Sequence, residues 1–392
     1  MQTKHSSNRR QALEQGFDTK LIHAGELVPR VHGAVTLPVF QSATFELEDD
    51  QPVRYIRQGN TPNHTVLGNK LAALEGAEAC HVTGSGMAAI STSLLTILST
   101  GDHLLAQWGL YGGTHELLSR SFPKLGIAVE WIDANCPETW AAKLRPTTKL
   151  IYVESMSSPL FRVGDLLAVA AFARANGLVS IIDNTFASPL NFRPAESCFD
   201  LSIHSGTKYL NGHDDIAAGA VIGRREWVTK IAHRMSHFGG ALDPHAAFLL
   251  HRGLKTLGVR VRYQNESALK IAEFLESQSE IERVNYPGLQ SHPDHARARD
   301  LFLGFGGTLS FEVVGGAASA ERLMRRLTLP VAAPSLGGVD SLVMRPAAVS
   351  HAGLTGAERA ALGIRDGLVR LAVGLETTED LILDLAQALA DG

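Results

Sequence analysis

Strand-like and helix-like segments alternate regularly between about residues 77 and 223, and this alternation limits the chain to few folds. The strand-like segments are short, apolar and rich in β-branched residues, and patterns with helical spacing, such as 166–176, lie between them. This order predicts an α/β fold with a mostly parallel sheet and helices on both faces. The expected strands are 77–83, 104–107, 128–133, 150–154, 179–183 and 201–204.

The segments before and after this region follow different patterns. The first 60 or so residues contain scattered Gly and Pro with little periodicity, which indicates an extended arm. After residue 254, helical patterns such as 268–275 come first, then strand-like runs at 308–314 and 368–373 and a helical run at 379–389. The expected divisions are an arm over residues 1–62, a large domain over 63–255 and a smaller C-terminal α/β domain over 256–392.

Lys208 follows the last of these strands and is the first candidate for a catalytic residue. In Ser205-Gly-Thr-Lys-Tyr209, the hydroxyls of Ser205 and Thr207 and the amine of Lys208 would emerge together at the strand end. Hydroxyls beside an amine suit an aldehyde that carries a phosphate, with which the lysine would form a Schiff base. An isolated exposed lysine is otherwise a solvated surface residue, so this interpretation requires support elsewhere in the chain.

Asp183 provides that support, because it stands at the end of the nearly continuous apolar run 178–182. A carboxylate at the end of a buried strand is costly unless a charged group pairs with it. The protonated ring nitrogen of pyridoxal phosphate is such a partner, and the pairing lets the ring accept electrons from a substrate carbanion. The alternative is that Asp183 only caps the turn that follows.

Two glycine-containing turns fit the same cofactor. Thr83-Gly-Ser-Gly-Met87 follows a candidate strand and opens a helical run, so its backbone N–H groups would face an anion. The third glycine of a dinucleotide fingerprint is missing, which argues against a nicotinamide enzyme. In Leu110-Tyr-Gly-Gly-Thr114, the glycines would let the ring of Tyr111 approach a flat cofactor, although Tyr111 alone would more often be a half-buried packing residue.

Composition argues against several other classes of protein. A chain of 392 residues with 45% apolar residues and a formal net charge of −4 is typical of a soluble protein with a large core. No strongly basic face indicates a nucleic-acid partner, and no apolar run has the length of a membrane span. Lys4, Arg9 and Arg10 are not followed by an apolar core, so we expect no secretory signal and a cytoplasmic protein.

Other polar clusters have simpler explanations than metal binding. His213-Asp-Asp215 belongs to the lysine motif, and His292-Pro-Asp-His295 lies at a polar helix start, so we expect no metal site. The basic run 322–326 has apolar residues at helical spacing and indicates a solvated helix face. We expect reduced, structural thiols at the widely spaced Cys80, Cys136 and Cys198.

With these motifs, the chain resembles the Cys/Met-metabolism group of pyridoxal-phosphate enzymes over nearly its whole length. That group contains cystathionine γ-synthase, cystathionine γ-lyase, cystathionine β-lyase and methionine γ-lyase. The resemblance implies fold type I, the aspartate-aminotransferase-like fold with a seven-stranded large sheet. Further markers in this sequence are Tyr55-Ile-Arg-Gln-Gly-Asn60, Leu242-Asp-Pro244, Arg252-Gly-Leu-Lys-Thr256, Ser335-Leu-Gly-Gly338 and Asp366-Gly-Leu-Val-Arg370.

The resemblance implies a role for each matching residue. Lys208 should form the Schiff base and carry the substrate proton, Asp183 should pair with the ring nitrogen, and Tyr111 should stack over the ring and assist the leaving group. The implied phosphate ligands are Ser85, Gly86, Met87, Ser205 and Thr207, with Tyr55 and Arg57 from a neighbouring subunit. The implied substrate residues are Ser335, Leu336 and Arg370, and Arg370 should clamp the α-carboxylate. The chain should therefore be a homodimer with shared active sites, and the family implies a homotetramer.

Four positions bear on the choice of substrate. Arg54 and Pro334 stand where cystathionine-handling γ-enzymes usually carry acidic residues that can meet the distal ammonium. Ser158 replaces the asparagine that normally supports the phenolic oxygen of the cofactor, so it is a further candidate at the substrate site. Gly113 stands where methionine γ-lyases carry a cysteine, which counts against that specialised activity.

The resulting hypothesis is a pyridoxal-phosphate-dependent γ-elimination or γ-replacement on sulfur-containing or O-acylated amino acids, similar to that of cystathionine γ-lyase. Cystathionine γ-synthase or O-acylhomoserine sulfhydrylase activity is the first alternative, and cystathionine β-lyase activity is the second. An alternative of another class is a cofactor-binding structural partner with little turnover.

Overall fold

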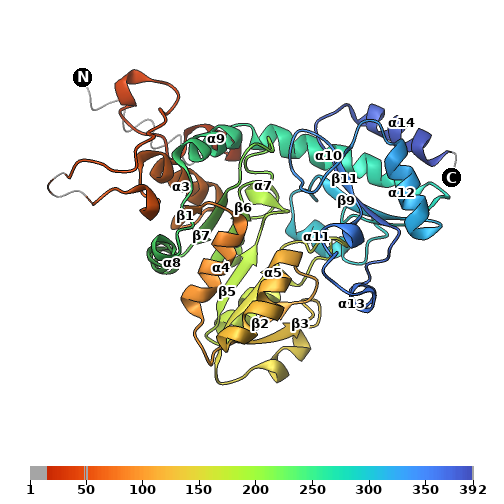
Figure 1. Ribbon diagram of the computed structural model, residues 1–392, viewed down its shortest axis with the longest axis horizontal. Helices are drawn as coiled ribbons and strands as arrows, with labels where there is room; N and C mark the ends of the chain where they lie inside the picture. Colours follow the sequence, from red (N-terminus) through yellow and green to blue (C-terminus); the bar gives the residue numbers. More distant parts are fainter. Residues whose placement is uncertain (1–15, 48, 50–51, 391–392) are drawn as a thin grey trace.

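The structure, a computed structural model, describes residues 16–47, 49 and 52–390. Among these residues, seven strands form a large sheet in the order β1-β7-β6-β5-β4-β2-β3 (Figure 1). Neighbouring strands are parallel except at β7, which runs antiparallel to β1 and β6. This confirms the expected mostly parallel, seven-stranded sheet. The strands are β1 (Ala79–Thr83), β2 (His103–Gln107), β3 (Ala128–Ile132), β4 (Thr148–Glu154), β5 (Val179–Asp183), β6 (Leu201–Ser205) and β7 (Gly219–Gly223).

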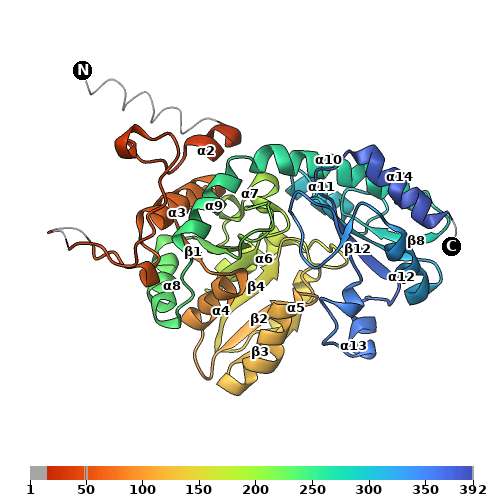
Figure 2. The same ribbon diagram turned by 45° about the horizontal axis from the view of Figure 1, so that its top comes forward.

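Helices cover both faces of this sheet because successive side chains of a strand point to opposite sides. In β2, Leu104 packs in a core with α4 (Gly86–Ile97) and α8 (Arg225–Phe238), whereas Leu105 packs in a core with α6 (Leu166–Ala175). Figure 2 shows α8 with α3 (Pro62–Glu75) and α9 (Pro244–Leu254) at the β1 end of the sheet, far from β3.

The six expected strands correspond to β1 to β6, and their ends differ from the expected ones by no more than two residues. β7 was not among the expected strands. Glycine is required at both of its ends, because a Cβ at Gly219 or Gly223 would lie 2.2 Å from the carbonyl oxygen of Ser85 or Asp200, respectively. Close backbone approach therefore fixes glycine at both ends of this strand, and the buried Ala220, Val221 and Ile222 form its middle.

The C-terminal part contains a smaller sheet in the order β10-β11-β12-β9-β8, which confirms the expected second sheet. Strands β9 and β12 correspond to the expected strands, whereas β8, β10 and β11 were not predicted. The strands are β8 (Ile281–Asn285), β9 (Thr308–Val313), β10 (Val331–Ala332), β11 (Leu342–Met344) and β12 (Leu368–Ala372). The helices that pack on this sheet are α10 (Leu257–Glu276), α12 (Gly316–Arg326) and α14 (Thr378–Leu389).

The described part of the N-terminal segment, residues 16–47, 49 and 52–61, belongs to neither sheet. It begins with α2 (Phe17–His23), a helix that the sequence pattern did not predict, and Asp18 of this helix pairs with Arg262 at 2.9 Å. The segment between α2 and α3 projects from the body of the molecule near α8 (Figure 1). Lys4, Arg9 and Arg10 lie outside the described residues. The remaining α-helices of the described part are α5 (Gly112–Glu116), α7 (Ser188–Asn191), α11 (His295–Leu301) and α13 (Gly356–Ala361).

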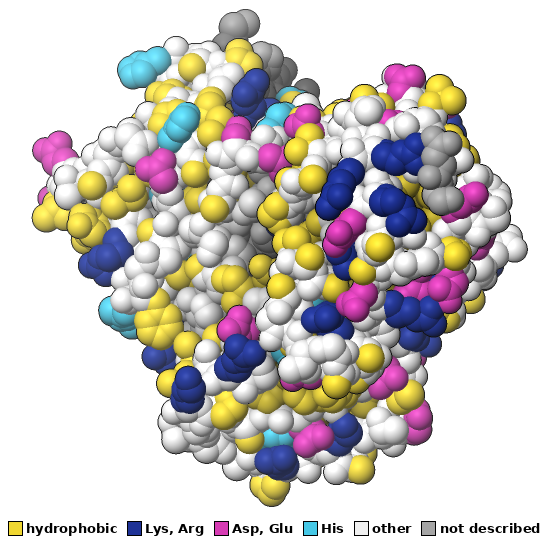
Figure 3. Space-filling view, turned by 45° about the vertical axis from the view of Figure 1, so that its right-hand side comes forward, with side chains coloured by type: hydrophobic (Ala, Val, Ile, Leu, Met, Phe, Trp, Pro, Cys, Tyr) yellow, Lys and Arg dark blue, Asp and Glu magenta, His cyan; other side chains and the backbone are white. Residues whose placement is uncertain are grey.

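Acidic and basic side chains are interspersed over the face shown in Figure 3. The basic run 322–326 lies in α12, where Arg325 pairs with Glu321 at 3.8 Å and Arg322 donates to Ser319 at 2.8 Å. The helical position agrees with the sequence pattern of this run. None of the helices formed by the described residues is long and apolar enough to cross a membrane.

Candidate active site

A cavity of about 510 Å³ lies at the carboxyl ends of the central parallel strands, the edge at which open α/β sheets bind ligands. Residues from the second sheet, including β12, close it from the other side. We call it the lysine cavity. It brings together the sequence-predicted residues Ser85, Gly86, Met87, Tyr111, Ser158, Asp183, Ser205, Thr207, Lys208, Ser335, Leu336 and Arg370.

Lys208 lines this cavity, and its Nζ donates a hydrogen bond of 2.6 Å to Oγ of Ser335. Burial lowers the pKa of Lys208, and the positive charge of Arg370 lowers it further, whereas Asp214 acts in the opposite direction. A lowered pKa increases the fraction of neutral amine, which is the form that acts as a nucleophile or a base. The surroundings of Lys208 therefore favour its reactive form.

Ser335 connects the lysine with the arginine of the same cavity. Its carbonyl oxygen accepts a hydrogen bond of 2.8 Å from Nη2 of Arg370, while its hydroxyl accepts the one from Lys208. The φ angle of Ser335 is 106°, a value that strains residues other than glycine. Burial lowers the pKa of Arg370 to about 10, so its guanidinium is charged near neutral pH, with more N–H donors than Ser335 uses.

Asp183 ends β5 and faces the cavity with a carboxyl group that Thr185 supports. Its Oδ1 accepts a hydrogen bond of 2.9 Å from the backbone N–H of Thr185. Burial raises the pKa of Asp183, and the hydrogen bonds from Thr185 act against this rise. A cation beside the carboxyl group would stabilise its ionised form. The protonated ring nitrogen of pyridoxal phosphate would supply such a positive charge.

Glu154 ends β4 beside Asp183, and the two residues are register partners in the sheet. Its Oε1 accepts a hydrogen bond of 2.7 Å from the backbone N–H of Tyr111. Burial raises the pKa of Glu154 well above its usual value, and the neighbouring Asp183 raises it further. Two adjacent buried carboxyl groups do not ionise together without a large cost, so we infer that Glu154 is the protonated member of the pair.

An anion site lies at the start of α4. Ser85 caps this helix by accepting a hydrogen bond of 3.0 Å from the N–H of Ala88. The N–H groups of Gly86 and Met87 have no acceptor within the helix, because they belong to its first turn. A Cβ at Gly86 would lie 3.0 Å from Cβ of Ser205, so glycine brings the two segments together. These groups suit a phosphate, and the hydroxyls of the cavity lining add further donors.

The lysine cavity therefore fits pyridoxal phosphate. Lys208 offers an amine for its aldehyde, the start of α4 offers donors for its phosphate, and Asp183 offers a carboxylate for its ring nitrogen. All three groups face one cavity that is large enough for the cofactor and an amino acid.

Tyr111 lines the same cavity and is 49% exposed. A Cβ at Gly113 would lie 2.7 Å from Cε1 of Tyr111 and 3.2 Å from Sδ of Met87. Glycine at position 113 thus makes room for the tyrosine ring beside Met87. From the sequence, the glycines were expected to let this ring approach a flat cofactor, and that role of the ring stays a prediction.

Tyr55, Arg57 and Arg54 lie on the projecting N-terminal segment and do not line the lysine cavity of their own chain. Nη1 of Arg57 donates a hydrogen bond of 2.6 Å to the carbonyl oxygen of Ser236 in α8, and its guanidinium lies 5.5 Å from the ring centroid of Tyr55. This position is compatible with the expectation that Tyr55 and Arg57 serve a neighbouring subunit, which stays a prediction.

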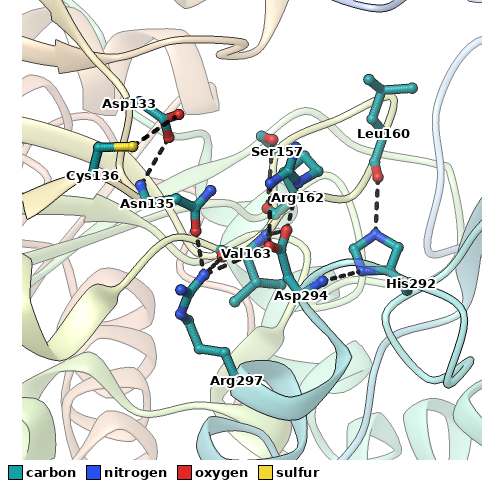
Figure 4. Close-up of polar contacts among 10 residues, drawn as sticks. All are labelled: Asp133, Asn135, Cys136, Ser157, Leu160, Arg162, Val163, His292, Asp294 and Arg297. Carbon is teal, nitrogen blue, oxygen red and sulfur yellow. Dashed lines mark hydrogen bonds and ion pairs between the residues drawn. The ribbon is translucent and has the colours of Figure 1, made fainter.

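The loop that carries Ser158 is fastened to the C-terminal part of the chain (Figure 4). Nε of Arg162 forms an ion pair of 2.6 Å with Asp294, which also accepts a hydrogen bond of 3.0 Å from the N–H of Val163. Arg297 donates to the carbonyl oxygen of Val163 at 2.8 Å. Oγ of Ser158 is buried and has no hydrogen-bond partner among the described residues. The loop thus holds an unused hydroxyl at the edge of the lysine cavity.

Glu154 and His351 also line the cavity, and no role was expected for either of them from the sequence. His351 is 4% exposed, its Nδ1 lies 2.9 Å from Oγ of Ser350, and burial lowers its pKa to about 4. Glu154 ends a buried strand as Asp183 does, so the same sequence signal could have identified it. His351 lies in a loop without periodicity, so no local pattern marks it.

The candidate metal motifs make other contacts. Nδ1 of His213 lies 2.8 Å from the carbonyl oxygen of Asn211, and Nδ1 of His295 lies 2.9 Å from that of Pro287. Within the described ranges, no group of three or more His, Cys, Asp or Glu residues is placed to hold a metal ion. The thiols of Cys80, Cys136 and Cys198 are free.

The protonation of Glu154 leads to a pH-dependent prediction. Because the pKa of Glu154 is higher in the folded than in the unfolded protein, its contribution to stability is full below the unfolded value and is lost as the pH rises through the folded value. Glu154→Gln is neutral at every pH, so its stability relative to the wild type should increase as the pH rises above 4.5, the ordinary pKa of glutamate. Thermal unfolding of both proteins across this range measures the difference.

Glu154→Ala serves as the control, because it removes the acceptor of the Tyr111 N–H and should cost about 1 to 3 kcal/mol. A difference between Glu154→Gln and wild type that stays constant with pH would mean that Glu154 is ionised in the folded protein.

Comparisons with known proteins agree with this site. Residues 18–390 match the family model described as Cys/Met metabolism PLP-dependent enzyme. An L-methionine gamma-lyase of Fusobacterium nucleatum subsp. polymorphum is 39% identical over 388 residues, which cover 95% of this chain and 98% of that protein. A cystathionine beta-lyase of Lactococcus lactis subsp. cremoris is 38% identical over 375 residues, which cover 95% and 98%.

A solved structure gives the same result for the fold. Cystathionine gamma synthase from Xanthomonas oryzae pv. oryzae, in complex with aminoacrylate and cysteine, superposes with a TM-score of 0.92 at 38% identity. The match covers 96% of this chain and 98% of that one. A fold of type I, a cavity with an amine, a carboxylate and a phosphate site, and a family match over nearly the whole length lead to one conclusion. The chain belongs to the family of Cys/Met metabolism PLP-dependent enzymes.

Proposed function

We propose that this protein catalyses γ-elimination or γ-replacement on a sulfur-containing or O-acylated amino acid, in the manner of cystathionine γ-lyase. The observation that carries the proposal is the meeting of Lys208, Asp183 and Arg370 in one cavity, which supplies a base, a counter-charge for the cofactor and a carboxylate clamp. Two of the relatives above, a methionine γ-lyase and a cystathionine γ-synthase, support chemistry at the γ carbon by their names.

When bound, pyridoxal phosphate supplies an electron sink that makes the Cα proton of an amino acid easier to remove. Asp183 would hold its ring nitrogen in the charged form. Nζ of Lys208 would take the Cα proton and deliver a proton towards Cβ or Cγ. Ser335, which accepts a hydrogen bond from this amine, would keep it oriented between these steps.

Arg370 and Tyr111 would act on the two ends of the substrate. The guanidinium of Arg370 would bind the α-carboxylate through two parallel, charge-assisted hydrogen bonds. Its 7% exposure means that little water competes for these donors. The hydroxyl of Tyr111 would give a proton to the group that leaves.

Arg54 and Pro334 disfavour a substrate that carries a distal ammonium group. Pro334 lines the lysine cavity without a charge, and Arg54 would repel an ammonium if it reached the cavity of a neighbouring subunit. A distal carboxylate or an uncharged thioether is therefore favoured within the proposed class. Gly113 counts against a specialised methionine γ-lyase.

A substrate panel tests the proposed reaction. The holoenzyme is incubated separately with cystathionine, O-acetylhomoserine, O-succinylhomoserine and methionine, with and without cysteine. We expect 2-oxobutanoate from γ-elimination, or thioether products in the presence of the thiol. Lys208 can take the proton from Cα and deliver a proton towards Cβ or Cγ, which both reactions need. Pyruvate as the only keto acid would replace this proposal with β-lyase chemistry.

Two alternatives have specific support. The relative named cystathionine β-lyase favours β-elimination, and the solved cystathionine γ-synthase favours replacement, which extends to O-acylhomoserine sulfhydrylase chemistry. The third alternative is a cofactor-binding partner with little turnover. It predicts that the absorbance of the bound cofactor stays unchanged when any amino acid of the panel is added.

We also propose that two chains form a dimer with shared active sites and that dimers pair into a tetramer. Tyr55 and Arg57 do not line the lysine cavity of their own chain, and this supports the dimer. The divisions at residues 62 and 255 stay proposals for the domain boundaries, and the cytoplasmic location stays a prediction.

Hybrid dimers test the sharing of sites. Arg57→Ala and Lys208→Ala should each be inactive alone, because each affects every site of a homodimer. Co-expressed in equal amounts, they should recover about a quarter of the wild-type activity, since each hybrid dimer contains one site with both native residues. Hybrids without activity, despite mixed dimers in native mass spectrometry, would show that Arg57 serves its own chain.

A further inference from the structure

A second cavity, of about 630 Å³, lies beside the lysine cavity and is larger than it. It lies between the ends of β2 and β3 and the segment 351–364, which includes α13. We call it the tryptophan cavity, because Trp108 and Trp131 line it. Its volume is typical of sites that hold small organic ligands, and the proposed reaction does not use it.

Three aromatic rings form one wall of this cavity. The ring centroids of Trp108 and Trp131 lie 5.2 Å apart, with an angle of 26° between the planes. His115 stacks on Trp131 at 4.9 Å and 24°. Trp108 is 49% exposed, although it is among the largest apolar side chains of the protein. Because these rings stack face to face, the partly exposed ring of Trp108 can continue the stack with a flat aromatic ligand.

The charges around the tryptophan cavity favour a cation. Asp133 and Glu358 contribute carboxylates, whereas the charge of Arg162 is balanced by its ion pair with the C-terminal part (Figure 4). Burial lowers the pKa of His115 and lowers that of His351 to about 4, so both rings are uncharged near neutral pH. The lining therefore carries a net negative charge.

Two buried polar atoms lie in the wall between the cavities. Ser158 and His351 line both cavities, and they are 6% and 4% exposed. Neither Oγ of Ser158 nor Nε2 of His351 has a hydrogen-bond partner among the described residues. An unpaired polar atom in this position is costly, and a ligand in either cavity would supply the missing partner.

We propose that the tryptophan cavity is a second ligand site, for a small planar aromatic molecule that carries a protonated amine. The ligand stacks against the aromatic wall, and its ammonium faces Asp133 and Glu358. Because Ser158 and His351 belong to both cavities, this ligand and the amino-acid substrate change each other's affinity by the same factor.

Isothermal titration calorimetry of the holoenzyme with gramine tests the proposal. Gramine is an indole with a tertiary amine, which is protonated at neutral pH and cannot condense with an aldehyde. We expect one gramine per chain, and binding of indole-3-acetate weaker by at least about tenfold, because its carboxylate would meet Asp133 and Glu358. Trp108→Ala should weaken gramine binding about tenfold, whereas the control Trp227→Ala in α8 should leave it unchanged.

A second variant keeps the test decisive if Trp108→Ala is poorly folded. Ala361→Trp extends from α13 into the cavity, leaves the aromatic wall in place and should abolish gramine binding. Binding that survives both variants would overturn the proposal, and so would the absence of binding to the wild type. Binding that is lost in Arg370→Ala but kept in Ala361→Trp would place gramine in the lysine cavity and overturn it as well.

Discussion

Replacing Lys208 by alanine is expected to lower kcat/KM by at least about 10³-fold, because the same amine serves as the nucleophile towards the cofactor and as the proton carrier. The fold should persist, since the side chain makes one described hydrogen bond, to Ser335. Its loss costs about 1 to 3 kcal/mol, and removal of a buried amine offsets part of that cost. Turnover is measured with the best substrate of the panel, and folding by thermal unfolding.

Lys149→Ala is the matched control for this variant. Lys149 is an exposed lysine on β4 of the same sheet, so its loss should leave turnover unchanged. Lys208→Arg adds a second comparison, because it keeps a positive charge but provides no amine that is neutral at working pH. Full activity of Lys208→Ala would rule out the proposed mechanism.

Arg370→Ala is expected to weaken substrate binding by about 1.5 to 3 kcal/mol, which is an increase in KM of roughly 10-fold to 150-fold. The large effect follows from burial, because a charged hydrogen bond to a carboxylate is stronger where water is excluded. Steady-state kinetics with saturation curves separate KM from kcat. Arg370→Lys should restore only part of the affinity, since an ammonium cannot form two parallel bonds to the carboxylate.

Arg365→Ala provides the control for the loss of a cation in this region. Arg365 precedes β12 on the surface and pairs with Glu282 at 2.5 Å, so its removal should leave KM unchanged. A KM in Arg370→Ala equal to that of the wild type would remove Arg370 from the substrate site and leave Lys208 and Asp183 in their roles.

The large sheet could be predicted because its strands are buried on both faces. Leu150, Ile151, Tyr152 and Val153 of β4 are all fully buried, and a continuous apolar run of this kind is visible in the sequence. β10 could not be predicted, because it consists of two exposed residues that gain their strand pairing only from β11. The insertion of β7 between β1 and β6 is likewise a tertiary pairing that chain order does not show.

The residues of the site could be predicted where they stand at or just after the end of a strand, or in a glycine-containing turn. Lys208, Asp183 and Gly86 are of this kind, and all three line the lysine cavity. His351 reaches the same cavity from a loop of the C-terminal part, which no local pattern connects with the large sheet. The expected role of Arg54 cannot be judged from a single chain, because it depends on the cavity of a neighbouring subunit and not on its own.

The backbone of Ser335 has a consequence for the mutational tolerance of this position. At a φ of 106°, glycine is the residue that relieves the strain, but glycine removes the hydroxyl that accepts the hydrogen bond from Lys208. Alanine loses the hydroxyl and keeps the strain, and threonine keeps the hydroxyl but adds a branch at Cβ. The backbone conformation therefore favours glycine, whereas the hydrogen bond to Lys208 requires a hydroxyl. Serine meets the second requirement at the cost of the first, and it contacts both Lys208 and Arg370 from one position.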